Sequence, residues 1–486
     1  MATRIFRYPP PMPRSLTSSL GGSISRAFRA LAPDPFVIAI LLLILTCLLA
    51  VVFGDFGAPD AALSFSAKFA RLADSFRDSG SGMHMWSLLT FTMQMCLVLV
   101  SGHVLASAPP VRRLISRLAD LPSTGHGAAA FVGFVACATG VINWGLGLIV
   151  GAVFAREVGK SLVRRGISHH FPIIAAAGYF GLMVWHGGLS GSAPLTMTSI
   201  DGAKRTLPEQ VVTQLSSAGF GDGVALDHTL FSNFNLLITG GLLVIVPLVL
   251  WLIAPRDTHE HAMMTSVTEG APDAEEASDT IPDRLDRASW INWTLAIALA
   301  AGVVKFIQMS SLSKAGLNEI NGAMLAMGLI LHGSPRRFMR AADEAAGSCG
   351  GIIVQFPIYA AIIAVMVNAG LIKVLADMAV SVKPELMPLT TFIAACVINL
   401  FVPSGGGQWA VQGPVALQAG LSAGVDPGKI IMSVAYGDQL TNMLQPFWAL
   451  PLLAITGVKA RDIVGYTALV MIVAGVWIGG VLVFVK

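Results

Sequence analysis

Long apolar segments, separated by short polar or charged stretches, follow one another along almost the whole chain. A helix needs about 20 residues to cross a hydrocarbon core of roughly 30 Å, and nine of the segments offer a stretch of about that length. The pattern therefore predicts an all-α protein that crosses a membrane many times. The predicted spans are 34–54, 84–108, 170–198, 228–254, 288–311, 318–334, 348–377, 428–458 and 462–485.

Two further apolar segments, 124–154 and 387–422, differ from these spans because Gly, Pro or Asn interrupts each of them in the middle. Each contains the sequence Val-Ile-Asn, which ends at Asn143 in the first segment and at Asn399 in the second. Interruptions of this kind free backbone groups at membrane depth, where those groups can hold a ligand. We therefore predict that each segment is a re-entrant hairpin.

A second pair of matching interruptions follows the hairpins. Pro194 lies 51 residues after Asn143, and Pro446 lies 47 residues after Asn399. We predict a broken helix at each proline, because proline removes a backbone donor and leaves a carbonyl behind it without a partner. Each hairpin and its broken helix belong to one repeat, and an offset of five crossings inverts the second repeat relative to the first.

The predicted fold class is an all-α polytopic membrane protein, an inverted-repeat secondary transporter with two re-entrant hairpins and two broken helices. This interpretation divides the chain into five parts. They are a basic cytoplasmic segment at 1–33, a first repeat at 34–254, an acidic cytoplasmic linker at 255–287, a connecting span at 288–317 and a second repeat at 318–486.

Composition and charge agree with a membrane protein. Hydrophobic residues make up 54% of the chain and charged residues 12%, with a mean hydropathy of +0.71, whereas a soluble domain carries about 25% charged residues. The net charge of +3 gives no reason to expect a nucleic-acid partner. About 20 of the 31 Lys and Arg residues fall on one side of the predicted topology, which predicts a cytoplasmic N-terminus and an outer C-terminus.

The glycine run of the second hairpin, in the sequence VPSGGGQWAVQGP at 402–414, is the most specific local signal. Consecutive glycines weaken a helix by about 1 kcal/mol each, and their bare N–H groups can receive a carboxylate. A hairpin tip that needs glycine only to turn is the alternative, and no Lys-Ser/Thr follows to make a phosphate-binding loop. The candidate substrate-binding residues of the two tips are Asn143, Trp144, Gly145, Ser404, Gly405, Gly406, Gly407, Gln408 and Trp409.

The broken helices carry the candidate ion-coupling residues. Asp438 is the only acidic residue that we place deep within a span, and a carboxylate there costs about 2.5–3.5 kcal/mol without a cation, proton or donor. His186 lies in the corresponding region of the first repeat and could relay a proton or be purely structural. The candidate ion-coupling residues are Ser190, Ser192, Asp438, Thr441 and Asn442, with Na⁺ or H⁺ as the coupling ion and no cofactor or other metal.

Four motifs, VINWGLGLIVGAVFARE, GGLSGSAPL, VPSGGGQWAVQGP and AYGDQLTNMLQPFWALP, resemble the bacterial short-chain fatty acid transporter family. That family is placed in the larger ion transporter superfamily. The resemblance covers about residues 30–460 and implies a carrier of the bacterial inner membrane for short monocarboxylates such as acetoacetate or butyrate. It further implies that hairpin tips bind substrate and often Na⁺, that a transport domain moves like an elevator, and that Asn143 and Asn399 are tip positions. The Ser-Asn-Thr tips of the Na⁺-coupled dicarboxylate carriers are replaced here by Asn-Trp-Gly and Ser-Gly-Gly-Gly.

Two other functions remain open from the sequence. A passive anion channel would also need many spans, and Gly188-Leu189-Ser190-Gly191 fits the GxSG of intramembrane serine proteases. A hydrolase would need His103 or His186 to reach Ser190 as a general base. The sequence does not decide whether the chain forms a homodimer.

Overall fold

The computed structural model describes residues 34–57, 63–78, 83–256, 280–309, 317–371, 374 and 383–485. Within them the chain is 81% helical and forms no strand, so the predicted all-α fold class is confirmed. By length and composition, seven of the described helices could each cross a membrane, and two of these seven are the first arms of the predicted hairpins. The predicted basic segment 1–33 and most of the acidic linker 255–287 lie outside the described residues.

Long helices occupy most of the predicted uninterrupted spans. Asp34 caps the first of them with its carboxylate, and Pro35 occupies the first helical position, where its missing N–H costs nothing. These helices are α2 (Pro35–Phe53), α4 (Leu89–Ser107), α12 (Asn233–Ile253), α14 (Ser289–Met309), α15 (Leu317–His332), α17 (Gly350–Asn368) and α23 (Ala460–Phe484). Shorter helices lie between them: α3 (Phe65–Asp74), α5 (Pro109–Ala119), α10 (Ile200–Thr206), α11 (Glu209–Leu215), α13 (Ile281–Asp286) and α16 (Pro335–Ala346).

The first hairpin consists of α6 (Gly125–Ile142) and α7 (Trp144–Arg164), which are separated by the single residue Asn143. Glycine allows the two helices to approach closely: a Cβ on Gly147 would lie 2.5 Å from the Cα of Gly140. The second hairpin consists of α19 (Met387–Phe401) and α20 (Gly405–Ser422), with a longer break between them. Both predicted hairpins are therefore present, and the second arm of the first extends beyond the predicted end at 154.

The two broken segments are divided more finely than the sequence predicts. The first consists of α8 (Phe171–Ala177), the 3₁₀ turns η1 (Phe180–Met183) and η2 (Trp185–Gly187), and α9 (Ser192–Met197). The second consists of α21 (Pro427–Thr441), the 3₁₀ turn η8 (Asn442–Leu444) and α22 (Pro446–Thr456).

The two prolines play different parts in these breaks. Pro446 opens α22 and marks the second break, as predicted. Pro194 lies in the first turn of α9, where an N–H has no intrahelical acceptor to lose, so the prediction that Pro194 breaks its helix is wrong. The interruption lies instead at the glycine-rich stretch 187–191, between η2 and α9. Gly188 also allows a close approach to the first hairpin, because a Cβ there would lie 2.2 Å from the carbonyl oxygen of Val141.

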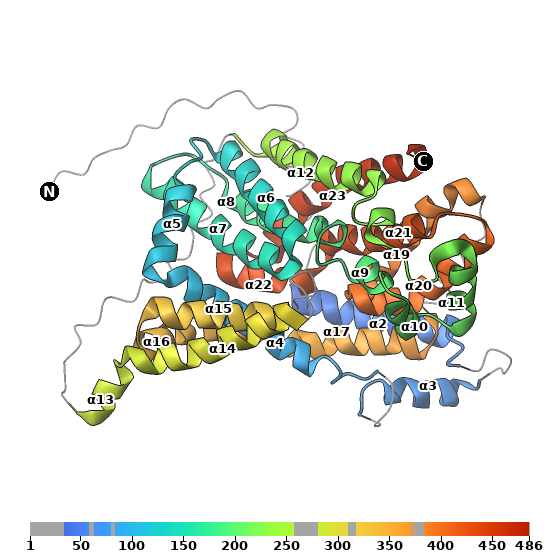
Figure 1. Ribbon diagram of the computed structural model, residues 1–486, viewed down its shortest axis with the longest axis horizontal. Coiled ribbons are helices and arrows are strands. Elements are labelled where there is room, and N and C mark those ends of the chain that lie inside the picture. Colours follow the sequence, from blue (N-terminus) through green and yellow to red (C-terminus); the bar gives the residue numbers. More distant parts are fainter. Residues whose placement is uncertain are drawn as a thin grey trace.

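The described helices form two layers (Figure 1). The first contains α2, α4 and α14–α17, in which α4 packs on α15, α16 and α17, and α17 packs on α2. The second contains both hairpins, both broken segments, α12 and α23. Aromatic stacking joins the layers: the ring centroid of Phe356 lies 5.7 Å from that of Phe91 and 4.2 Å from that of Phe447.

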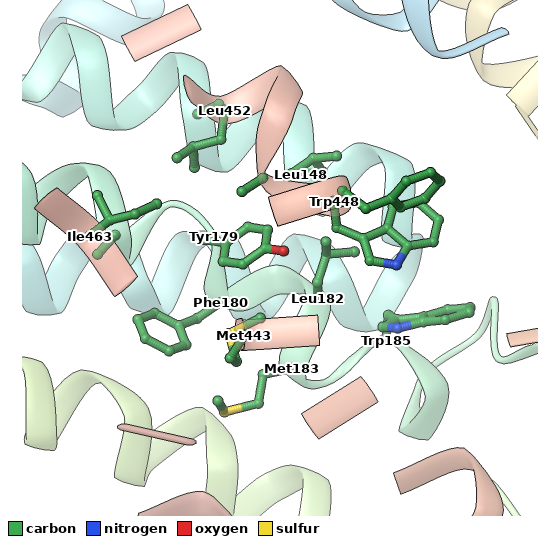
Figure 2. Packing of buried hydrophobic residues seen from close by; sticks show 14 of the residues in the cluster. Leu148, Tyr179, Phe180, Leu182, Met183, Trp185, Met443, Trp448, Leu452 and Ile463 are labelled. Carbon is green, nitrogen blue, oxygen red and sulfur yellow. The ribbon is translucent and has the colours of Figure 1, made fainter. Parts of the chain in front are cut away.

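Figure 2 shows that the core of the second layer draws its side chains from both broken segments. Tyr179, Phe180 and Met183 interleave there with Met443 and other residues of the second repeat. The Tyr179 hydroxyl is fully buried and donates to the carbonyl oxygens of Asn442 at 2.7 Å and Gln445 at 3.1 Å. The two breaks are thus fixed to each other.

Candidate functional site

The tip of the first hairpin is closed by polar side chains of its own repeat. Asn143 Oδ1 accepts from the N–H groups of Gly145 at 3.0 Å and Leu146 at 3.2 Å, and so caps α7. Trp144 N donates to Ser190 Oγ at 3.0 Å. Residues that were predicted to bind two different ligands therefore form one local unit: Asn143, Trp144 and Gly145 for the substrate, and Ser190 for the ion. Within this unit the first N–H groups of α7 have acceptors.

The tip of the second hairpin is open by comparison. Ser404 caps α20 by accepting from Gly407 N at 3.2 Å. Gly405 and Gly406 are the two residues before Gly407, and the first N–H groups of a helix have no intrahelical acceptor. No described residue accepts a hydrogen bond from the N–H of Gly405 or of Gly406. A Cβ on Gly406 would meet no heavy atom within 4 Å, so the space beside it is free.

Asn399 does not occupy the place of Asn143, although the two are matched in sequence. It lies within the last turn of α19 and donates to Asp438 O at 2.6 Å, Thr441 Oγ1 at 3.1 Å and Asn442 Oδ1 at 2.9 Å. The predicted tip position for Asn399 is therefore wrong, because α19 continues to Phe401 before Pro403 restricts the residue ahead of it. Ser404 is the structural counterpart of Asn143.

Gln408 and Trp409 hold the second hairpin together rather than face its tip. Gln408 Nε2 donates to Ala395 O at 3.0 Å and to Gln412 Oε1 at 2.8 Å, and its side chain is fully buried. Trp409 is 1% exposed and packs in a separate cluster with Leu417. The structure does not bring these two predicted substrate residues to the open space at Gly406.

The four predicted hydroxyl and amide residues for an ion fall in two places. Ser190 contacts the first tip, and Ser192 is a half-buried residue at the start of α9. Thr441 and Asn442 surround Asn399, and Thr441 Oγ1 also donates to Cys396 O at 3.0 Å. The oxygens at the C-terminal end of α21 thus accept hydrogen bonds from Asn399 and from Tyr179. Among the described residues there is no cluster of three His, Cys, Asp or Glu side chains that could hold another metal.

A buried pair of charged or polar side chains joins the two repeats. His186 Nε2 lies 3.1 Å from Asp438 Oδ1, and the two side chains are only 1% and 3% exposed. His186 N donates to the side-chain oxygen of the neighbouring Gln439 at 3.0 Å. A Cβ on Gly405 would lie 2.5 Å from His186 Nε2, so the open tip of the second hairpin rests on the break of the first repeat.

Three tryptophans meet beside this contact, and two of them were not predicted. The ring centroid of Trp144 lies 6.2 Å from that of Trp185 and 5.3 Å from that of Trp448. In Figure 2 Trp185 and Trp448 lie at the same end of the core cluster. Sequence reasoning missed Trp185, although it precedes His186, because tryptophan in an apolar segment is usual for packing.

The comparison of the sequence with known proteins identifies the family. The profile of the short chain fatty acid transporter family matches residues 16–485. The chain belongs to this family. A relative in Escherichia coli K12, provisionally named a short-chain fatty acid transporter, is 36% identical over 455 residues, which cover 91% of this chain and 94% of that protein. A relative in Haemophilus influenzae with the same provisional name is 34% identical over 447 residues, covering 90% and 93%.

Two solved transporter structures are more distantly similar. The Alcanivorax borkumensis YdaH transporter gives a TM-score of 0.40 at 17% identity, with 93% of this chain and 98% of that chain covered. Neisseria gonorrhoeae MtrF, from a class of antimetabolite efflux pumps, gives a TM-score of 0.37 at 17% identity, with 94% and 96% covered.

We predict that Gly405→Ala lowers the melting temperature of the detergent-purified protein and that Gly406→Ala does not. The Cβ at 405 would overlap His186, and overpacking costs about 1–3 kcal/mol, whereas the Cβ at 406 enters free space. The neighbouring glycine is the control for any general effect of alanine in this turn. Equal melting temperatures for the two variants would show that the tip does not rest on His186.

Proposed function

We propose that this member of the short-chain fatty acid transporter family is a secondary active transporter. It moves short-chain fatty acids or other small monocarboxylates across the bacterial inner membrane, with its N-terminus in the cytoplasm. The observation that carries the proposal is the open tip of the second hairpin, where Gly405 and Gly406 present unpaired N–H groups beside free space. The partial positive charge of a helix N-terminus and these N–H groups suit one carboxylate.

The surroundings of the tip favour a small monoanion. Apolar surface near the tip comes from Trp144 and Trp185 of the first repeat and from Trp448 of the second. His186 is the neighbouring titratable group and is already 3.1 Å from Asp438. With one anion-binding helix end and an aromatic wall, a ligand with a single carboxylate and a short apolar chain fits better than a dicarboxylate.

The two layers support an elevator-type mechanism. Both hairpins and both broken segments pack on one another in a single layer, and His186 and Tyr179 connect the two breaks directly. The contact of this layer with α4 and α17 includes the stacked rings of Phe91, Phe356 and Phe447, whose non-directional packing can be remade after a shift. The hairpin layer would carry the substrate past the layer that contains α2, α4 and α14–α17.

A hydrolase at Ser190 receives no support from the contacts of the described residues. Ser190 Oγ accepts from Trp144 N, while His186 faces Asp438 and His103 lies 3.5 Å from Glu344 in the other layer. Neither of these two histidines is thus placed as a general base for Ser190. A passive channel is the remaining alternative, and transport kinetics separate it from a carrier.

The proposal predicts counterflow in proteoliposomes that contain the purified protein. Vesicles loaded with unlabelled butyrate should transiently accumulate external radiolabelled butyrate, because a carrier exchanges the two through one alternating site. The same assay with acetate, acetoacetate and hexanoate orders the substrates, and succinate is the dicarboxylate control. Uptake that does not saturate, without counterflow for any acid of the panel, would favour a channel and contradict the proposal.

We expect Asp438 to couple this exchange to Na⁺ or H⁺. The change Asp438→Asn preserves size but removes a charge that is buried within the hairpin layer. The variant should therefore retain butyrate counterflow and lose accumulation driven by a Na⁺ or pH gradient. Asp426→Asn is the matched control, because Asp426 caps the same helix at its exposed start, where Asn caps equally well. Unchanged gradient-driven accumulation by Asp438→Asn would exclude the coupling role.

A further inference from the structure

The Trp185 side chain carries a buried donor that the fold does not use. The residue is 5% exposed, and among the described residues no atom accepts a hydrogen bond from its Nε1–H. Buried indole N–H groups usually have a partner, because leaving one without an acceptor is unfavourable. The described residues thus supply no acceptor for this donor, and a bound ligand could supply one.

The Trp185 indole lies against the tip of the second hairpin. A Cβ on Gly405 would lie 2.8 Å from Cη2 of Trp185, so the six-membered ring of the indole contacts the first residue of α20. The same residue is in contact with the His186 imidazole, whose Nδ1 also has no partner among the described residues. Two side chains with unused polar atoms from the first repeat thus adjoin the open N-terminus of α20, which belongs to the second.

The Trp185 ring forms an apolar wall together with two other tryptophan rings. Trp144 lies between Trp185 and Trp448, at 56° to the first ring and 74° to the second. Phe447 packs against Trp448, with ring centroids 5.0 Å apart. The three indoles come from α7, η2 and α22, three elements that no local sequence pattern would bring together.

We propose that Trp185 is a substrate-binding residue. Its indole N–H donates to the carboxylate held at Gly405 and Gly406, and its ring, with those of Trp144 and Trp448, receives the acyl chain. This inference rests on the proposed function and adds the residue by which the first repeat contacts the substrate. It predicts a preference for short chains, since the three packed rings would limit the length of the acyl chain.

The test is a set of dissociation constants for acetate, butyrate and hexanoate, measured by titration calorimetry on the full-length protein in nanodiscs. Trp185→Phe keeps an aromatic ring and removes the N–H, so it should weaken all three acids by about 10- to 100-fold, the effect of a hydrogen bond to a charged group. Trp477→Phe is the matched control. Its indole N–H donates to Ile238 O at 3.2 Å, between α12 and α23, and its loss should leave the constants unchanged.

Trp448→Ala tests the wall separately. Removing this ring would leave room for a longer acyl chain beside Trp144, so hexanoate should gain on butyrate by about fourfold for each additional methylene that is buried. If Trp185→Phe does not fold, benzothienylalanine at position 185 keeps the ring shape and replaces the N–H with sulfur.

The outcomes separate this inference from the proposed function. Affinities within twofold of the unmodified protein for Trp185→Phe, or for its benzothienylalanine equivalent, would overturn the role of the indole. An unmodified protein that binds none of the three acids would overturn the proposed function as well. A loss confined to hexanoate would show a packing effect and would contradict the contact with the carboxylate.

Discussion

Backbone groups that are freed where a helix stops inside an apolar interior must find partners, and the hairpin layer is organised around this requirement. Asn143 and Ser190 satisfy the first N–H groups of α7. At the breaks, Asn235 donates to Gly187 O at 3.0 Å, and Tyr179 donates to the carbonyls that follow α21. Against this background the open N-terminus of α20 is an exception, and exceptions of this kind are where a ligand can take the place of a side chain.

The partners of the freed groups come from both repeats, and this unites the layer. Tyr436 donates to Asn235 Oδ1 at 2.8 Å, so α21 fixes the side chain that satisfies the first break. His186, at the first break, in turn lies 3.1 Å from Asp438 in α21, the helix that precedes the second break. Because these contacts join the two breaks, we expect the two hairpins and the two broken segments to move together, in agreement with the elevator-type mechanism that we propose.

The sequence alone predicts the parts that depend on local composition. Apolar length located the long helices, and Gly, Pro and Asn located both hairpins and both interrupted segments. Prediction from the sequence failed where the same motif occupies different places in the two repeats. Val-Ile-Asn marks the tip in the first repeat but lies in the last turn of α19 in the second, because the following Leu and Phe continue the helix.

The partners within the site could be predicted only in part. Asp438 was identified because an isolated carboxylate in an apolar segment must be compensated. Its contact with His186 joins residues 252 positions apart and leaves no periodic signal. For the same reason the sequence pointed to Trp409 at the tip, whereas Trp185 is the tryptophan that contacts Gly405; only tertiary packing decides which of several buried tryptophans lies there.

The central claim is that a monocarboxylate binds at the open tip of the second hairpin, and protection of a cysteine placed there tests it most directly. Gly406→Cys would be introduced after replacement of the five native cysteines, Cys47, Cys96, Cys137, Cys349 and Cys396. Its alkylation rate by a small thiol reagent would be compared with that of Ser422→Cys, at the exposed far end of α20. The account predicts that saturating butyrate slows alkylation several-fold at position 406 and leaves it unchanged at position 422. Equal rates at position 406 with and without butyrate, in a protein that binds butyrate, would contradict it.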